Sequence, residues 1–324
     1  MVWSKVLSFD DPSLYSAALQ TVTTEILPTV PGQFHGELTQ IRMDRVWMQR
    51  FEVNVPQISA GTLNASRTVF AFLSDKSSGN VRYNGSNIQH GDIVTGFDAY
   101  HLRSEPHLRL ASLSLPNDDF PLICKAVLGH ELSSFAYLAR PAPELMSRLS
   151  LLHKTIGQLA HDVPEILDTP EVGRALEHQA ILLLVRCLAD SASARTGKGF
   201  HRHNVIISKF EEFLASHPDR PLYITEICKV LGVSERTLRA CCEEYLGMGP
   251  IRYLALRRMH LVRRALLRAD VANATVTKII TDHGFWELGR FSSAYRALFG
   301  ELPSHTLRRP AQDKQVGVHP LRRF

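Results

Sequence analysis

The C-terminal part of the chain contains the same pattern twice: a short apolar helix, a glycine turn and a second amphipathic helix. The first copy spans Ile224–Cys241 around Gly232, and the second spans Val276–Tyr295 around Gly284. This spacing is typical of a helix-turn-helix, whose second helix enters the major groove of DNA. One such pattern is a weak signal, because ordinary helical hairpins match it. Two copies joined by one basic helix favour a sequence-specific DNA-binding module.

A helix expected over residues 250–269 joins the two copies. Pro250 suits its first turn, since the N–H that proline lacks would be unpaired there. A helix of about 20 residues is about 30 Å long, and successive major grooves on one face of B-DNA lie about 34 Å apart. A rigid connector of this length can place two reading helices in adjacent grooves. Six arginines are expected on its outward faces: Arg252, Arg257, Arg258, Arg263, Arg264 and Arg268.

The outward positions of the two reading helices are predicted to contact DNA. Ser234 suits an N-cap, because its hydroxyl can accept from the first free N–H groups of a helix. Glu287 is expected near the start of the second reading helix, as a cap or as a base reader. Arginine in a reading helix can bind guanine O6 and N7 with two hydrogen bonds, although it can also simply face solvent. The predicted DNA-binding residues are Ser234, Arg236, Arg239, Ala240, Gly289, Arg290, Ser293 and Arg296.

Charge is distributed unevenly along the 324 residues. The net charge is +5, of which residues 201–324 carry +8 and residues 1–200 carry −3. The basic half is the half with the repeated motif, which suits a polyanionic partner such as double-stranded DNA. The length predicts two domains, and the hydrophobic fraction of 44% is that of an ordinary globular protein.

The lack of recognisable targeting signals and the pattern of cysteines predict a cytoplasmic location. No apolar run approaches the roughly 18 residues of a membrane span, and residues 1–10 do not resemble a signal peptide. The five cysteines include no C-x-x-C pair and no metal-ligand spacing. We therefore expect free thiols in a reducing compartment and no membrane partner.

The first 190 residues are expected to form a separate α+β domain. Residues 34–115 contain short apolar or alternating stretches separated by Gly, Asn and Ser, which predict a small β-barrel or sandwich. Within them, residues 81–94 predict two strands with tight turns. Residues 144–190 then show a helical period, and these helices either cover the barrel or form a dimer seam. Residues 191–199 are mostly small and flexible, and we expect the interdomain linker at 191–202.

The C-terminal residues closely resemble the AraC/XylS family of bacterial transcription regulators. The resemblance covers about 203–310 and rests on Leu246–Leu254, Arg257–Leu267 and Gly284–Ser304. The chain departs from the family at four positions. Cys228 and Ile280 replace a usual alanine, Cys242 a usual aromatic residue and Gly289 a usual serine. Residues 31–38 and 284–291 are similar to one branch of the family, which includes the activator of ethanolamine-utilisation genes.

This resemblance implies an architecture and a function. The expected fold class is α+β, with an N-terminal cupin-like β-barrel plus helices (1–190) and an all-α DNA-binding domain (203–310). The latter holds helix-turn-helix motifs at 224–245 and 276–299 and is followed by a tail at 311–324. The implied function is that of a ligand-responsive transcriptional activator. Its implied partners are double-stranded promoter DNA, RNA polymerase, a small-molecule effector of unknown identity and a second copy of the chain.

Three other interpretations remain open at this stage. A metal-dependent cupin-type enzyme is possible in principle, because His35, His90, Asp92, His101 and His107 fall in the β region, but no H-x-H with a downstream acidic ligand is present. A redox sensor could use Cys241 and Cys242, although adjacent helical residues point about 100° apart and do not readily bridge. A regulator without any small ligand is the third. We predict no enzyme, no cofactor, and no catalytic or metal-binding residue; the sequence does not indicate which residues would bind a small ligand.

Overall fold

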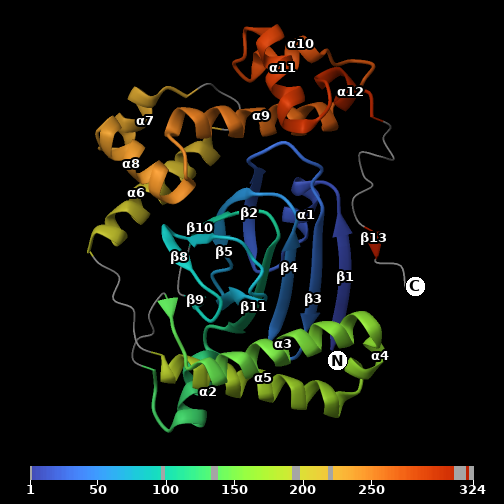
Figure 1. Ribbon diagram of the computed structural model, residues 1–324, viewed down its shortest axis with the longest axis vertical. Helices are drawn as coiled ribbons and strands as arrows, with labels where there is room; N and C mark the ends of the chain where they lie inside the picture. Colours follow the sequence, from blue (N-terminus) through green and yellow to red (C-terminus); the bar gives the residue numbers. More distant parts are fainter. Residues whose placement is uncertain are drawn as a thin grey trace.

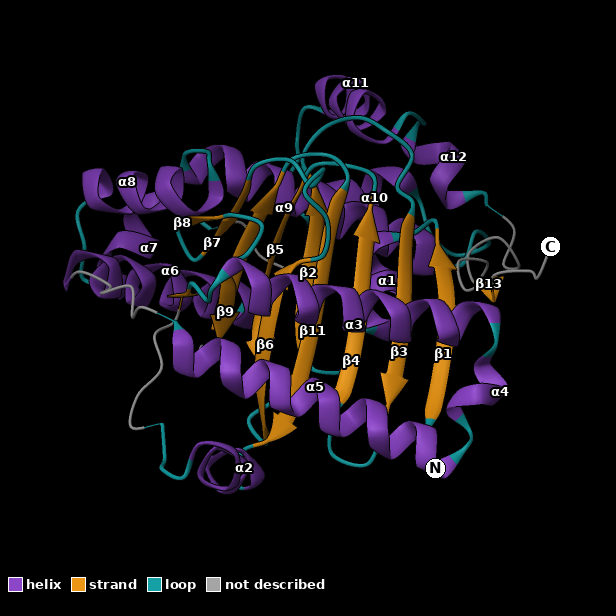
Figure 2. Ribbon diagram, turned by 60° about the horizontal axis from the view of Figure 1, so that its bottom comes forward, coloured by secondary structure: helices purple, strands orange, loops and turns teal. Residues whose placement is uncertain are grey.

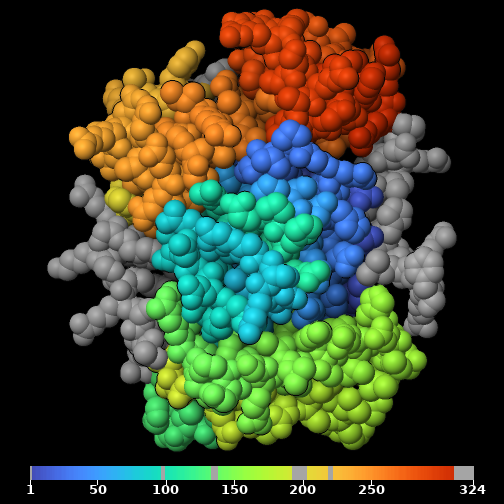
Figure 3. Space-filling model, viewed as in Figure 1, coloured from blue at the N-terminus to red at the C-terminus, as the bar shows by residue number. Residues whose placement is uncertain are grey.

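The computed structural model describes residues 2–95, 99–132, 138–191, 198–217, 222–309 and 319–320. Two β-sheets lie at the centre, a pair of long helices covers one side, and the helical C-terminal half lies on the opposite side (Figure 1). The space-filling view shows the same succession, with the C-terminal helices packed closely on the sheets (Figure 3). The expected α+β fold is therefore confirmed, and its two halves are in extensive contact.

All strand pairs of the two sheets are antiparallel. The strand order of the first sheet is β12 (Leu138–Ala139), β9 (Ile93–Thr95), β6 (Arg67–Leu73), β11 (Leu108–Pro116), β4 (Trp47–Val53), β3 (Gly36–Arg42), β1 (Trp3–Phe9) and β13 (His319–Pro320). The order of the second sheet is β2 (Val22–Pro28), β5 (Gln57–Leu63), β10 (Ala99–Ser104), β7 (Val81–Tyr83) and β8 (Ser86–Ile88).

The two facing sheets contain the expected β region, residues 34–115, together with β1, β2, β12 and β13, which the sequence does not predict. Among the described residues no ladder joins one sheet to the other, so they form a sandwich and not one closed barrel. The hairpin predicted within residues 81–94 is present as β7 and β8. Asn84 (φ 46°) and Gly85 (φ 80°) form its turn, and this pair of left-handed residues matches the right-handed twist of the flanking strands.

Strand β6 shows how alternation divides the interior into two cores. Phe70 and Phe72 point from the first sheet towards the covering helices and are fully buried there. Ala71 and Leu73 point the other way, into a second core between the two sheets. A strand buried on both faces gives the continuous apolar run of residues 69–73 in place of a strict alternation.

Helices α3 (Pro143–Asp162) and α5 (Pro170–Asp190) lie across the outer face of the first sheet (Figure 2). Leu149 and Ile156 of α3 are fully buried against it. The carboxylate of Glu177 accepts hydrogen bonds from the backbone N–H groups of Arg45 and Val46, at 2.7 and 2.8 Å. Part of the apolar stripe of these helices thus covers the sheet.

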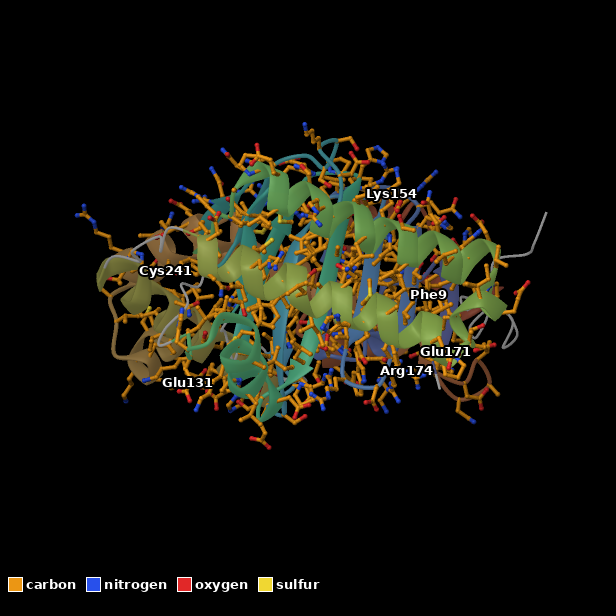
Figure 4. The ribbon with its side chains drawn as sticks, turned by 90° about the horizontal axis from the view of Figure 1, so that it is seen from below. Phe9, Glu131, Lys154, Glu171, Arg174 and Cys241 are labelled. Atoms are coloured by element: carbon orange, nitrogen blue, oxygen red, sulfur yellow. The ribbon has the colours of Figure 1, made fainter. Side chains whose placement is uncertain are left out.

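Three shorter helices complete the N-terminal half: α1 (Pro12–Ala18), α2 (Asp119–Leu128) and α4 (Pro164–Leu167). Figure 4 views the molecule from the side of α3 and α5. Glu171 and Arg174 lie together at the start of α5, where they form an exposed ion pair of 3.0 Å. Cys241 lies far from them, in the C-terminal half.

The C-terminal half is helical, as expected. Its elements are α6 (Lys198–Ser216), α7 (Ile224–Leu231), α8 (Glu235–Leu246), α9 (Pro250–Arg268), α10 (Val276–Asp282), α11 (Leu288–Phe299) and α12 (Pro303–Leu307). None of the described helices is long and apolar enough to cross a membrane. Residues 192–197 of the expected linker and residues 311–318 and 321–324 of the expected tail lie outside the described residues.

Candidate nucleic-acid interface

The first helix-turn-helix is formed by α7 and α8. Gly232 ends α7 in the left-handed conformation (φ 65°), which a residue without a Cβ adopts freely. Ser234 is the N-cap of α8, and its hydroxyl accepts from the backbone N–H of Thr237 at 3.1 Å. Ile227 and Leu238 are fully buried between the two helices. The capping role predicted for Ser234 is therefore present in the structure.

The second helix-turn-helix is formed by α10 and α11. Gly284, again left-handed at φ 78°, leads into the turn between the two helices. Phe285, Phe291 and Tyr295 form a continuous aromatic core, with Phe285 and Phe291 ring centroids 4.6 Å apart. Glu287 occupies the N-cap position of α11 but makes no capping hydrogen bond. It accepts instead from the Arg290 guanidinium at 2.7 Å.

The two reading helices present their predicted residues to solvent. Among the described arginines that form ion pairs, Arg290 is the most exposed, at 85% of its side-chain surface. Arg239 pairs only with Glu235 on its own helix, at 3.4 Å, and such exposed pairs contribute little to stability. A phosphate or base edge can therefore replace these partners. The exposed residues are Ser234, Arg236, Arg239, Ala240, Gly289, Arg290, Ser293 and Arg296, which is the complete predicted set.

The environment of the connector α9 differs from the prediction. The sequence places its arginines on outward faces, but Arg257 and Arg264 both bind the carboxylate of Glu25 in β2, Arg257 at 2.9 Å. Arg263 binds Asp11 at 3.0 Å. These three arginines face the N-terminal half. They supply the counter-charges of Glu25 and Asp11, whose carboxylates would be costly to bury unpaired. Of the six arginines of α9, only Arg252 and Arg268 are exposed to solvent.

The N-terminal half also contacts the first reading helix. Tyr245, near the end of α8, packs edge-on against the ring of His101 in β10, with centroids 6.2 Å apart. Leu27 and Ile58 of the second sheet belong to the same buried core as Phe210 of α6. The sequence does not predict this contact, because the residues that meet lie far apart in the chain. Only the C-terminal end of α8 is covered, and its N-terminal turn stays free.

Burial and charge shift several pKa values at this contact. Burial would raise the pKa of Glu25, but Arg257 and Arg264 hold it below its ordinary value. Burial lowers the pKa of His260 to about 4, so this side chain is neutral where its Nε2 meets the carbonyl of Pro28, at 3.1 Å. Burial raises the pKa of Glu211 in α6 to about 7, although Tyr253 and Arg257 oppose the rise.

The structure also bears on the metal and redox interpretations. Among the described residues, no group of three His, Cys, Asp or Glu side chains is arranged to hold a metal ion. His101 is buried and Asp92 binds Arg140 at 3.3 Å, whereas His90 and His107 are exposed. Cys241 and Cys242 are fully buried thiols. Burial raises the pKa of Cys242, which disfavours the thiolate that redox chemistry requires.

Comparison with known proteins identifies the family. The family described as "Helix-turn-helix domain" matches residues 227–309. The XylDLEGF operon transcriptional activator 2 of Pseudomonas putida is 30% identical over 131 residues, which are 40% of this chain and 83% of that relative. The chain belongs to the AraC/XylS family of DNA-binding transcriptional regulators. The predicted family is thus confirmed.

Other proteins match a shorter part of the chain or have a lower sequence identity. The probable thc operon regulatory protein of Rhodococcus erythropolis is 39% identical over 97 residues, which are 30% of this chain and 29% of that protein. The crystal structure of the AraC-like transcriptional activator CuxR aligns with 87% of this chain and 100% of its own, at a TM-score of 0.42 and 15% identity. The chain spans less than half the length of several of its relatives.

Proposed function

We propose that this AraC/XylS-family protein is a ligand-responsive activator that reads two successive major grooves of promoter DNA. The observation that carries the proposal is the pair of exposed reading helices, α8 and α11, fixed on one connector. The 19 residues of α9 span about 29 Å, close to the separation of about 34 Å between adjacent grooves. The role is binding, not catalysis.

The activating role is proposed from the relatives, because those of Pseudomonas putida are named operon transcriptional activators. An activator of this kind acts on RNA polymerase at the promoter, and we place the protein in the cytoplasm with the chromosome. A homodimer remains our expectation. Leu151 of α3 is 65% exposed, so the 144–190 helices keep apolar surface for the proposed seam. The assignment to the ethanolamine branch also stays a prediction.

Half-site spacing tests the proposed reading mode. A selection of random duplexes by the full chain should yield two half-sites with centres about 10 base pairs apart. Inserting 5 base pairs between them turns one half-site to the opposite face of the duplex. We expect the affinity for the inserted site to fall to that of a single half-site. An insertion of the same length outside the site is the control, and equal affinity for both insertions would contradict paired reading on a rigid connector.

A further inference from the structure

The most exposed large apolar side chain in the described part of the chain is that of Trp286, with 77% of its surface open to solvent. This residue lies in the turn between α10 and α11, two positions before α11 begins at Leu288. Both helices lie beyond α9, on the side away from the sheets (Figure 1). The indole therefore faces solvent at the start of a reading helix.

The turn of the second motif is one residue longer than the turn of the first. The backbone N–H of Val233 donates to the carbonyl five residues earlier, at 3.1 Å, and that of Phe285 does the same, at 3.2 Å. Val233 and Phe285 thus occupy equivalent places. From there α8 begins two residues later and α11 three residues later. Each helix has one N-cap residue in this interval, so Trp286 is the residue that the second turn adds.

The residues on both sides of Trp286 are held in place. The ring of Phe285 packs against Phe291, with centroids 4.6 Å apart, and the guanidinium of Arg258 lies 5.1 Å from its centroid. The carbonyl of Glu287 accepts the backbone N–H of Phe291 at 2.9 Å. An inward ring before Trp286 and a helix start after it fix the turn, so no loop has to be ordered when the indole meets a partner.

The exposed neighbours of Trp286 favour nucleic acid as this partner. Arg290 is 85% exposed, and its ion pair with Glu287 offsets the carboxylate beside the indole. Lys278 of α10 is also exposed. A Cβ added at Gly289 would meet no atom within 4 Å, so the first turn of α11 is open to close approach. A basic surface with one apolar side chain matches the major groove, where arginine binds guanine and apolar groups contact thymine.

We propose that Trp286 reads thymine: its indole packs against C5-methyl groups in the half-site that α11 reads. Among the four DNA bases only thymine carries a methyl group in the major groove, so an apolar contact there selects it. The inference rests on the proposed reading of DNA by α11. It adds an aromatic side chain, presented by a turn, to the DNA-binding residues that the sequence predicts.

Replacement of thymine by deoxyuridine tests the contact, because it removes the methyl group and keeps the base pair. The duplex is the one selected by the full chain, and the half-site of α11 is the one whose base preference changes in Arg290→Ala. One or two of its thymines should be sensitive, each replacement lowering the affinity of wild type about 4-fold, as expected for one buried methyl group. A half-site without thymine, or one whose thymines are all replaced without loss, would overturn the proposal.

Trp286→Ala connects this sensitivity to the indole. The variant should bind the thymine duplex at least about 4-fold more weakly than wild type and should not distinguish it from the deoxyuridine duplex. Its unfolding midpoint should stay unchanged, because the exposed side chain packs against little of the chain. Tyr223→Ala is the matched control, since Tyr223 is an aromatic residue with 71% exposure outside the second motif. It should keep the deoxyuridine effect, and persistence of that effect in Trp286→Ala would refute the contact.

Fluorescence reports on the indole directly. The chain has three tryptophans, and Trp3 and Trp47 both lie in the first sheet beside Arg42. In a Trp3→Phe/Trp47→Phe chain, the specific duplex should shift the emission of Trp286 to shorter wavelength and protect it from acrylamide, a neutral quencher that DNA does not repel. A duplex of unrelated sequence is the control. Equal quenching with and without the specific duplex would contradict burial of the indole against DNA.

Transcription and DNA binding measured together separate this proposal from the function on which it rests. If Trp286→Ala keeps its DNA affinity and the deoxyuridine effect but no longer activates purified RNA polymerase, the indole contacts a protein and the proposal is overturned. Specific DNA binding by wild type without any thymine effect also overturns it, and leaves paired reading of DNA standing. Absence of sequence-specific binding by wild type would instead overturn the proposed function itself.

Discussion

At the residue scale, arginine has two distinct roles in the C-terminal half. Arg236, Arg239, Arg290 and Arg296 are exposed on the reading helices. Arg257, with 10% of its side chain exposed, is held by Glu25 of the other half. The same side chain suits both environments, since its planar fork of donors binds carboxylates, phosphates and guanine edges alike. Its role is set by what the fold brings next to it.

Arg236 and Arg296 should behave as a base reader and a phosphate anchor. Arg236 lies in the first turn of α8, so Arg236→Ala should cost about 1–3 kcal/mol on the best site and relax preference at one or two base pairs. Arg296 lies in the last turn of α11, so Arg296→Ala should weaken all sequences evenly and flatten the salt slope by about one unit. Site selection with each variant and salt titration measure both effects. Identical changes in the selected motif would show that these roles are wrongly assigned.

Glu211 should make stability fall as pH rises towards neutrality. Its pKa is raised to about 7 in the folded protein and is about 4.3 in an unfolded chain. The folded protein therefore stays protonated at this carboxyl up to a higher pH. Its contribution to stability is fully present below about pH 4.3 and is lost as pH rises through 7. Glu211→Gln is neutral throughout and should gain about 3 kcal/mol relative to wild type between pH 5 and pH 8. Urea unfolding of both proteins measures this difference, and parallel pH profiles would contradict the prediction.

At the element scale, the start of α8 combines helix capping with DNA contact. Ser234 accepts from Thr237 N–H and is itself exposed at the end of the helix that faces the major groove in our proposal. Four N–H groups at any helix start lack partners inside the helix, so a side-chain acceptor there both stabilises the helix and fixes its direction. One serine can therefore affect stability and DNA affinity by separate routes.

Two substitutions of Ser234 should separate these routes. Ser234→Ala removes the cap and should lower the free energy of unfolding by about 1 kcal/mol. Ser234→Asp keeps an acceptor and should preserve stability, but its negative charge faces DNA phosphates and should weaken DNA binding. Thr275→Ala, at the N-cap of α10, is the control for a cap outside the reading helices. DNA affinity of Ser234→Asp equal to that of wild type would place Ser234 away from the DNA.

At the scale of the whole molecule, a partly buried ion-pair cluster attaches the DNA-binding half to the N-terminal half. Glu25 meets Arg257 and Arg264, and Asp11 meets Arg263. Since the pKa of Glu25 is lowered in the folded protein, its contribution is present above about pH 4.3 and is lost as pH falls through the lower folded value. Attachment of the two halves should therefore weaken in acid.

Glu25→Gln should loosen this attachment at neutral pH. The substitution leaves two arginines without their counter-charge, a loss of about 3 kcal/mol for a buried pair. Amide hydrogen exchange in β2 and α9 should then be about 100-fold faster. Glu171→Gln breaks an exposed ion pair with Arg174 and should leave exchange at β2 and α9 unchanged. Equal exchange in both variants would mean that hydrophobic packing alone joins the halves.

The DNA-binding half could be predicted from the sequence because its determinants are local. Gly232 and Gly284 adopt the left-handed turns that their positions predict, and Ile227 and Leu238 pack within one hairpin. The Asn84–Gly85 turn follows from the same kind of short-range rule. The exposure of the predicted reading residues follows as well, because a helical period fixes which side faces outwards.

Only the tertiary structure decided what the connector arginines bind and where β2 lies. The partner of Arg257 is 232 positions away in the chain, and no local period can encode such a pair. The sequence does not predict strand β2, because Thr23 and Glu25 interrupt its apolar pattern. The position of α9 beside the strand explains why these residues are polar. Local steric rules act between neighbours in sequence, whereas charge pairing and the facing of two sheets act between neighbours in space.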